Sequence, residues 1–203
     1  MCFRLAGFTL AITLVAATAA RAQDFGVLES AETINPGNVK LGAFPLFVFP
    51  DEGDTDFRLP ISVGFGLGPS FDVEGRAAFS DDLTFVGGDG EYWFLKNAPL
   101  DMSLRGGLHW GFVDGEVGDT FGVDVSVLGS APVASRVELI GALDMAFNSM
   151  DIGDERDGFT TVHLVPGVEI AINDDLDFVG EFGLGVTDSS SHYAAFGLAF
   201  YFR

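Results

Sequence analysis

Beyond residue 23 the chain alternates apolar and polar positions with a period of two. The alternation fills segments of about 9–13 residues, and clusters of Gly, Asp, Asn, Pro and Ser mark turns between them. Ten such segments can be recognised: 38–49, 57–67, 71–79, 83–95, 100–112, 120–129, 136–147, 159–172, 176–186 and 192–202. No stretch shows sustained helical periodicity. The pattern therefore predicts an all-β chain of about ten antiparallel strands.

Most segments have one face that is free of charge. In segment 57–67 this face holds Phe57, Leu59, Ile61, Val63, Phe65 and Leu67. Across eight of the ten segments no charged residue falls on the apolar face, whereas Arg, Asp and Glu are frequent on the other face. A charge on a lipid-facing strand costs roughly 2–4 kcal/mol at the bilayer midplane. The clean face is therefore typical of strands that face lipid.

Segments 38–49 and 83–95 fit this pattern less well. In the first, apolar side chains occupy both faces: Phe44, Leu46 and Val48 on one, and Val39, Leu41, Phe47 and Phe49 on the other. In the second, the Gly87-Gly88 pair interrupts the alternation, and a β-bulge there would restore it. Eight or twelve strands therefore remain compatible with the sequence.

Alternation alone fits two barrels that are inverses of each other: a membrane barrel with an apolar outside, and a soluble lipocalin-like barrel with an apolar inside. The polar face favours the membrane barrel, because it is rich in Gly and mixes Arg with Asp and Glu, while Lys is scarce. Aromatic residues also gather toward segment ends, as at membrane interfaces. The predicted fold is a closed antiparallel up-and-down transmembrane β-barrel. Its expected lumen-lining residues are Arg58, Asp72, Glu74, Arg76, Arg105, Asp124, Glu138, Asp144, His163, Glu169, Asp177 and Glu181.

The first residues read as a secretory signal peptide. Arg4 supplies a short basic region, an apolar stretch follows, and Ala20-Arg21-Ala22 provides a small-residue cleavage site. We expect residues 1–22 to be cleaved, 23–37 to form an N-terminal periplasmic lead-in, and 38–203 to form the barrel. The single cysteine, Cys2, leaves with the signal, so the mature chain is expected to lack thiol chemistry.

The chain ends in alternating aromatic and small or aliphatic residues, Phe196-Gly197-Leu198-Ala199-Phe200-Tyr201-Phe202-Arg203. This end resembles the C-terminal strand of Gram-negative outer-membrane β-barrel proteins, in which a Gly precedes alternating hydrophobics and a terminal aromatic. The chain departs from that pattern at Arg203, which follows the aromatic. The resemblance implies residence in the cell outer membrane and recognition of this strand by the barrel-assembly machinery.

Charge limits the chemistry that we expect. A formal net charge of −20 and a pI near 4.1 argue against a nucleic-acid partner. His109, His163 and His192 stand in no recognisable spacing with a nucleophile, so catalysis is not predicted. No cofactor is expected, although acidic loops offer oxygen ligands suited to Ca²⁺ or Mg²⁺, with solvated loops the favoured interpretation. The candidate ligands are Asp51, Asp54, Asp56, Asp151, Asp154 and Asp157.

A ten-strand barrel is little wider than the eight-strand size at which side chains fill the interior. The sequence therefore predicts a small monomeric barrel in contact with outer-membrane lipid and lipopolysaccharide, either structural or a narrow cation-preferring pore of porin-like kind. The alternatives are a soluble periplasmic lipocalin-like barrel that carries an apolar ligand, and an outer-membrane enzyme.

Overall fold

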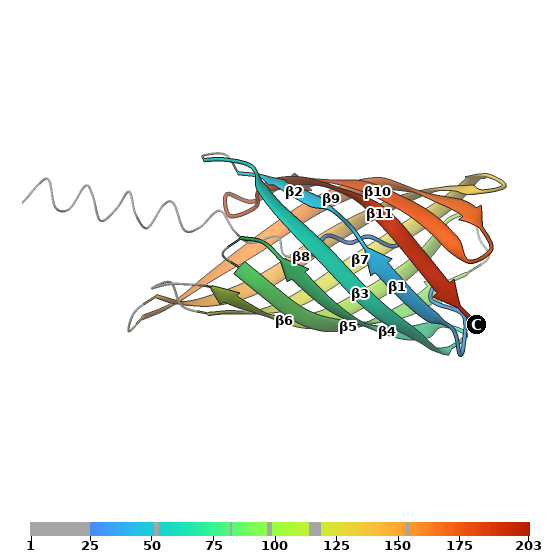
Figure 1. Ribbon diagram of the computed structural model, residues 1–203, viewed down its shortest axis with the longest axis horizontal. Coiled ribbons are helices and arrows are strands. Elements are labelled where there is room, and N and C mark those ends of the chain that lie inside the picture. The colour runs from blue at the N-terminus through green and yellow to red at the C-terminus, as the bar shows by residue number, and fades with distance from the viewer. Residues whose placement is uncertain (1–24, 51–52, 82, 97–98, 114–118, 153–154) are drawn as a thin grey trace, which may run out of the picture.

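The computed structural model describes residues 25–50, 53–81, 83–96, 99–113, 119–152 and 155–203. The expected signal peptide, 1–22, lies outside the described residues. The strands are β1 (Val39–Ala43), β2 (Leu46–Phe49), β3 (Asp56–Gly68), β4 (Phe71–Phe79), β5 (Leu83–Leu95), β6 (Asp101–Val113), β7 (Thr120–Ala134), β8 (Val137–Ile152), β9 (Glu155–Asn173), β10 (Leu176–Gly185) and β11 (His192–Phe202). Each pairs antiparallel with its neighbours, and together they form one closed barrel (Figure 1).

The barrel has ten strand positions, because β1 and β2 share one of them. Both short strands pair with β3 on one side and with β11 on the other. They are interrupted at Phe44-Pro45, where proline has no N–H to donate. The prediction of a closed ten-strand antiparallel barrel is confirmed.

The outer surface is apolar and the inner surface is polar. In β3 the odd-numbered residues face outward, and Phe65 is 46% exposed, whereas the even-numbered Arg58 is 1% exposed. Buried charged residues occur along the inside of most strands. A soluble barrel with an apolar interior has the opposite arrangement, so that alternative is excluded.

Several boundaries differ from the sequence-based expectation. The predicted bulge at Gly87-Gly88 is wrong, since β5 keeps its register with β4 and β6 across both glycines and shifts only between Trp93 and Leu95. The stretch between the predicted segments 136–147 and 159–172 is largely paired, because β8 and β9 stay in register out to Ile152 and Glu155.

The connections define two ends of the barrel. Among the described residues, the turn end holds 69–70, 96, 99–100, 135–136 and 174–175 together with the C-terminus, and the loop end holds 50, 53–55, 80–81, 119 and 186–191. Outer-membrane barrels have short periplasmic turns and longer extracellular loops. Among the residues that the structure describes, no helix is long and apolar enough to cross a membrane.

Candidate functional site

Residues 25–35, here called the N-terminal segment, run along the barrel lumen, with 25–34 inside it and Asn35 exposed at its end. Val27 and Leu28 are buried, and Ala31 is 0% exposed. The segment runs from Phe25, which packs on Phe85 in the loop half of the lumen, to Ile34 near the turn end (Figure 1). We expected residues 23–37 to lie in the periplasm, and the structure instead places 25–34 within the lumen. The physical reason lies in the lumen wall, which offers this stretch both apolar and polar partners.

The apolar partners form two clusters. Val27, Leu28 and Ala31 pack in one with inward-facing apolar residues of the wall. Those wall residues are Phe44, Leu46, Val48, Leu128, Ile140, Val165, Val179, Tyr193, Ala195 and Ala199. Phe25 packs in the second cluster with Leu83 and Phe85. These clusters explain the two segments that fitted the sequence pattern poorly, because the apolar residues on their second face point at the N-terminal segment.

The wall also hydrogen-bonds the backbone of the N-terminal segment. The carboxylate of Glu181 on β10 accepts from the N–H groups of Val27 and Leu28 at 2.8 and 2.7 Å. Ser130 Oγ on β7 accepts from the N–H of Ala31 at 3.3 Å. On β4, Asp72 accepts from the N–H of Ile34 at 2.7 Å. Backbone donors that would cost free energy if buried alone are thereby satisfied.

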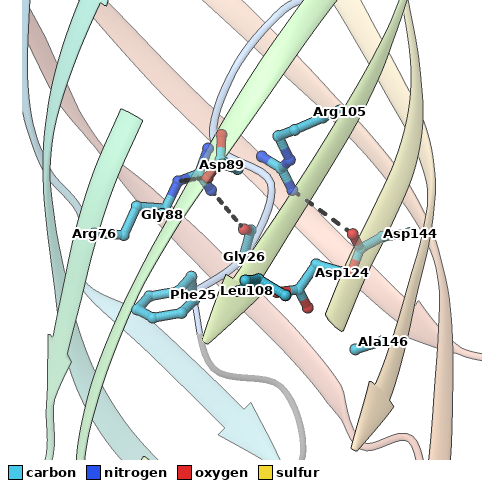
Figure 2. A pocket seen from close by; sticks show the side chains of 10 residues that line it. All are labelled: Phe25, Gly26, Arg76, Gly88, Asp89, Arg105, Leu108, Asp124, Asp144 and Ala146. Atoms are coloured by element: carbon cyan, nitrogen blue, oxygen red, sulfur yellow. Dashed lines mark hydrogen bonds and ion pairs between the residues drawn. The ribbon is translucent and has the colours of Figure 1, made fainter. Parts of the chain in front are cut away.

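Glu29 is the centre of a buried charge network. Its Oε1 lies 2.8 Å from Arg76 Nη2 and 2.5 Å from Arg105 Nη1, and its Oε2 lies 3.2 Å from Lys40 Nζ. Arg105 also donates to the carbonyl of Val27 at 3.0 Å, and Arg76 to that of Gly26 at 3.3 Å. Figure 2 shows the two arginines on either side of Gly26. Three strands, β1, β4 and β6, thus place a cation against one carboxylate.

Glycine makes room for the segment at two positions. A Cβ on Gly66 of β3 would collide with the carbonyl oxygens of Ile34 and Asn35. Gly26 has a φ of +74°, which side chains rarely adopt, and a Cβ there would lie 2.7 Å from Glu181 Oε1. The backbone therefore approaches the wall more closely than other residues would allow.

The structure places all twelve of the expected lumen-lining residues at inward or half-buried positions. Arg58, Asp72, Glu74, Arg76, Arg105, Asp144, His163 and Glu181 are buried, and Asp124, Glu138, Glu169 and Asp177 are half-buried. The sequence interpretation missed four further charged residues of the wall: Lys40, Asp89, Glu91 and Asp101. Lys40, Asp89 and Glu91 belong to the two poorly phased segments, for which the alternation did not indicate which face is inward. Asp101 stands at the turn-end start of β6, and the predicted list omitted it.

Two cavities adjoin the N-terminal segment. One, of about 30 Å³, lies beside Phe25 and Gly26 and is also lined by Asp89 and Asp144 (Figure 2). The other, of about 160 Å³, lies toward the turn end beside Glu29, Glu32 and Asn35. Small-molecule pockets have volumes of about 300–1,000 Å³. These cavities suit water or small ions rather than an organic solute.

His109 and His163 are hydrogen-bonded to other residues of the lumen wall. His109 places Nδ1 2.7 Å from Asp124 and Nε2 2.9 Å from Asn148. His163 Nε2 lies 2.9 Å from the carbonyl oxygen of Ser191, and its ring packs edge-on to Tyr193. These contacts orient the rings as parts of hydrogen-bonded networks.

The loop carboxylates are only partly described. Asp51 and Asp154 lie outside the described residues, as does the side chain of Asp151. Asp56 pairs with Arg58 at 2.9 Å, Asp157 accepts a hydrogen bond from the N–H of Gly158, and Asp54 is exposed. The described residues therefore bring together no set of these carboxylates around a cation position.

A different acidic group lies at the turn end. Glu32, Asp101 and Glu138 place one oxygen each within 4.8 Å of one another. Partial desolvation raises the pKa of Glu32, and the nearby carboxylates of Glu138 and Asp101 raise that pKa further. The wall therefore attracts the carboxylate of Glu29, which meets three cations, and repels the carboxylate of Glu32, which meets two other carboxylates.

Comparison with solved structures finds similar proteins at low sequence identity. The COG4313 outer membrane channel from Pseudomonas putida F1 is 10% identical with a TM-score of 0.55, covering 89% of this chain and 100% of that one. The KdgM porin is 8% identical with a TM-score of 0.48, covering 81% and 99%. The N-terminal β-barrel domain of Pseudomonas aeruginosa OprF is 13% identical with a TM-score of 0.42, covering 82% and 98%.

No curated protein matches the chain. Residues 7–202, however, match the family described as "Outer membrane protein beta-barrel domain". The match covers nearly the whole chain and agrees with the closed barrel, its apolar outer surface and its polar lumen. The chain is therefore a member of the outer membrane protein beta-barrel domain family, an integral porin-like protein of the bacterial outer membrane.

Proposed function

We propose that this small outer-membrane barrel is structural and closed to solutes in the conformation described here. The observation that carries the proposal is the burial of the N-terminal segment along the lumen, where Ala31 has no exposed surface. A ten-strand barrel already has a narrow interior. The two cavities that adjoin this peptide, of about 30 and 160 Å³, are too small for a permeating organic solute.

A second candidate function is a narrow cation-preferring pore that opens when the segment leaves. The charge of the wall favours this candidate, since the carboxylates outnumber the cations Lys40, Arg58, Arg76 and Arg105. The inward carboxylates are Asp72, Glu74, Asp89, Glu91, Asp101, Asp124, Glu138, Asp144, Glu169, Asp177 and Glu181. A lining of one sign selects ions of the opposite sign.

Planar-bilayer recordings test both functions. The full-length mature protein is expected to be silent. Glu29→Lys places a fourth cation beside Lys40, Arg76 and Arg105, and should expel the segment and give small, cation-preferring currents. Glu32→Lys makes the same charge change among carboxylates and should stay silent. Steady conductance of the unmodified protein would contradict the closed structural function, and anion preference of Glu29→Lys would contradict the pore.

We further propose that the barrel is monomeric and contacts outer-membrane lipid and lipopolysaccharide, and that the barrel-assembly machinery recognises β11. The outward Phe196, Phe200 and Phe202 of β11 support both contacts. Phe202→Ala should lower the yield of assembled barrel in cells, whereas Tyr201→Ala, at the neighbouring half-buried position, should not lower it through this recognition. Equal yields for Phe202→Ala and the unmodified protein would remove the proposed recognition.

A further inference from the structure

We propose that the lumen wall is a binding site for an acidic peptide in an irregular conformation, and that the N-terminal segment occupies this site as an exchangeable ligand in cis. The inference rests on the proposed function in one respect, since it takes the segment as the element that closes the lumen. It adds that closure is a binding equilibrium with a defined ligand chemistry. A peptide with the sequence of residues 25–36 should therefore bind to the same wall when it is supplied separately.

The wall recognises the segment as it would recognise a separate peptide. Donors and acceptors of the segment backbone meet side chains of strands far away in the sequence: Glu181 on β10, Ser130 on β7, Asp72 on β4 and Arg105 on β6. The separations reach 154 residues. None of these contacts depends on the covalent link between the segment and β1.

The wall side chains hold one another in place without the segment. Arg76 pairs with Asp89 at 2.9 Å and with Glu74 at 3.0 Å, in addition to its contact with Glu29. Lys40 pairs with Glu74 at 2.7 Å. The contacts of Lys40 with Glu74 and of Arg76 with Asp89 link neighbouring parts of the wall, so both cations stay paired when Glu29 departs.

Two further partners of the segment, Arg105 and Glu181, are also held by other residues of the wall. Arg105 donates to Ser126 Oγ at 3.2 Å and lies 3.6 Å from Asp144. Tyr193 donates to Glu181 at 2.9 Å and fixes the carboxylate that accepts from the segment backbone. A preorganised site of this kind avoids part of the ordering cost of binding.

Charge sets the preferred ligand. Three cations converge on the position of Glu29, so the site selects a carboxylate there. Three residues on, Glu32 faces Asp101 and Glu138, and this position disfavours a carboxylate. The preferred ligand is therefore a peptide with an acidic residue at the position of Glu29 and a neutral residue at the position of Glu32.

A nicked full-length barrel provides the test. Residues 35–37 are exposed, and a side chain added at Gly37 would meet nothing within 4 Å, so a protease recognition sequence inserted after Pro36 should be accessible. The chain is folded first and then cleaved. The cut segment is expected to remain bound in detergent. A fluorescent synthetic peptide of residues 25–36 should then exchange into the site and be detected by anisotropy.

Matched peptides distinguish binding at a specific site from non-specific retention of any peptide in the lumen. The Glu29→Gln peptide lacks the negative charge that Lys40, Arg76 and Arg105 all meet, so it should bind about 100-fold more weakly than the native peptide. The Glu32→Gln peptide carries the same change three residues away and should bind as tightly or more tightly. Equal weakening of both peptides would overturn the assigned charge preference.

The outcomes are distinguishable from those of the proposed function. Immediate loss of the cut segment, with no uptake of the fluorescent peptide, would overturn the exchangeable site even if the uncut barrel is silent in bilayers. Conversely, conductance of the uncut barrel would contradict the closed function while leaving peptide exchange measurable. Currents that appear on removal of the cut segment and disappear on addition of the peptide would support both.

Discussion

Glu29 and Arg76 are 47 residues apart in the sequence, yet their charged groups lie 2.8 Å apart inside the barrel. Arg76 also bonds the backbone of the same segment at Gly26. Breaking a buried ion pair from one side typically costs about 3–5 kcal/mol, because the remaining charge stays buried. The ion pairs of Glu29 therefore add to the apolar contacts and backbone hydrogen bonds that hold the N-terminal segment in the lumen.

Gly66→Ala should destabilise the folded barrel by displacing the segment. Its Cβ would meet the carbonyl oxygens of Ile34 and Asn35, and overpacking of this kind costs about 1–3 kcal/mol. Gly141→Ala is the matched control, because its Cβ would find its nearest neighbour at an ordinary 3.8 Å. The free energy of unfolding by urea from lipid vesicles measures both. A Gly66→Ala barrel as stable as the Gly141→Ala barrel would mean that the segment does not lie against β3.

A thiol placed in the segment should be protected from reagents. The only cysteine of the chain, Cys2, precedes the expected cleavage site, so an introduced cysteine can be followed alone. Ser30→Cys lies at a buried position and should react slowly with a maleimide in the folded protein, whereas Asn35→Cys, at an exposed position, should react quickly. Adding Glu29→Lys should accelerate labelling at Ser30→Cys only. Fast labelling at both positions in the unmodified background would place the segment outside the lumen.

Leu143→Arg should impair assembly strongly because it places a charge against hydrocarbon. Leu143 faces outward near the middle of β8, and the expected loss is about 2–4 kcal/mol in the free energy of unfolding. Leu67→Arg lies on the outward face at the turn-end limit of β3 and should cost only about 0–1 kcal/mol. If folding into liposomes tolerates both variants equally, the outward face is not in lipid.

Glu32→Gln should stabilise the barrel at neutral pH, and the gain should vanish in acid. The raised pKa of Glu32 means that the folded state binds its proton more tightly than the unfolded state does. The wild-type protein therefore carries a penalty above the raised pKa, and this penalty disappears as the pH falls below the ordinary value of 4.5. Thermal midpoints of both proteins between neutral pH and pH 4 should converge. A gap that widens on acidification would show that Glu32 is instead stabilised as an anion.

The barrel itself could be predicted from sequence because lipid imposes a strict rule on outward positions. Every second residue of a strand such as β3 faces lipid, as Phe57, Ile61 and Phe65 do, and must be apolar because a charge there is costly. The rule for inward positions is weaker, since a side chain there has only to satisfy its neighbours. Ala142 shows the difference, because it faces inward yet packs against the apolar cluster rather than against polar groups.

The occupation of the lumen by residues 25–35 could not be derived from the alternation within that stretch, although the wall residues carried an indication of it. Residues 25–35 are a short mixed stretch whose partners come from many strands. The signal lay in the wall: Phe44, Leu46 and Val48, together with Leu83 and Phe85, are apolar on a face that should be polar. Inward apolar residues in a membrane barrel need an apolar partner in the lumen, and the segment supplies it.

The shared strand position of β1 and β2 also bears on how the barrel is assembled. These strands pair with β11, so the seam that closes the sheet joins the start of the chain to its end. The N-terminal segment immediately precedes β1, on the same side of that seam. While the seam is open, the segment can be laid sideways on β4, β6, β7 and β10, and no chain end needs to be threaded through a finished barrel. Pairing of β1 and β2 with β11 closes the sheet around the segment, so a segment already lying on the open wall is enclosed by that closure.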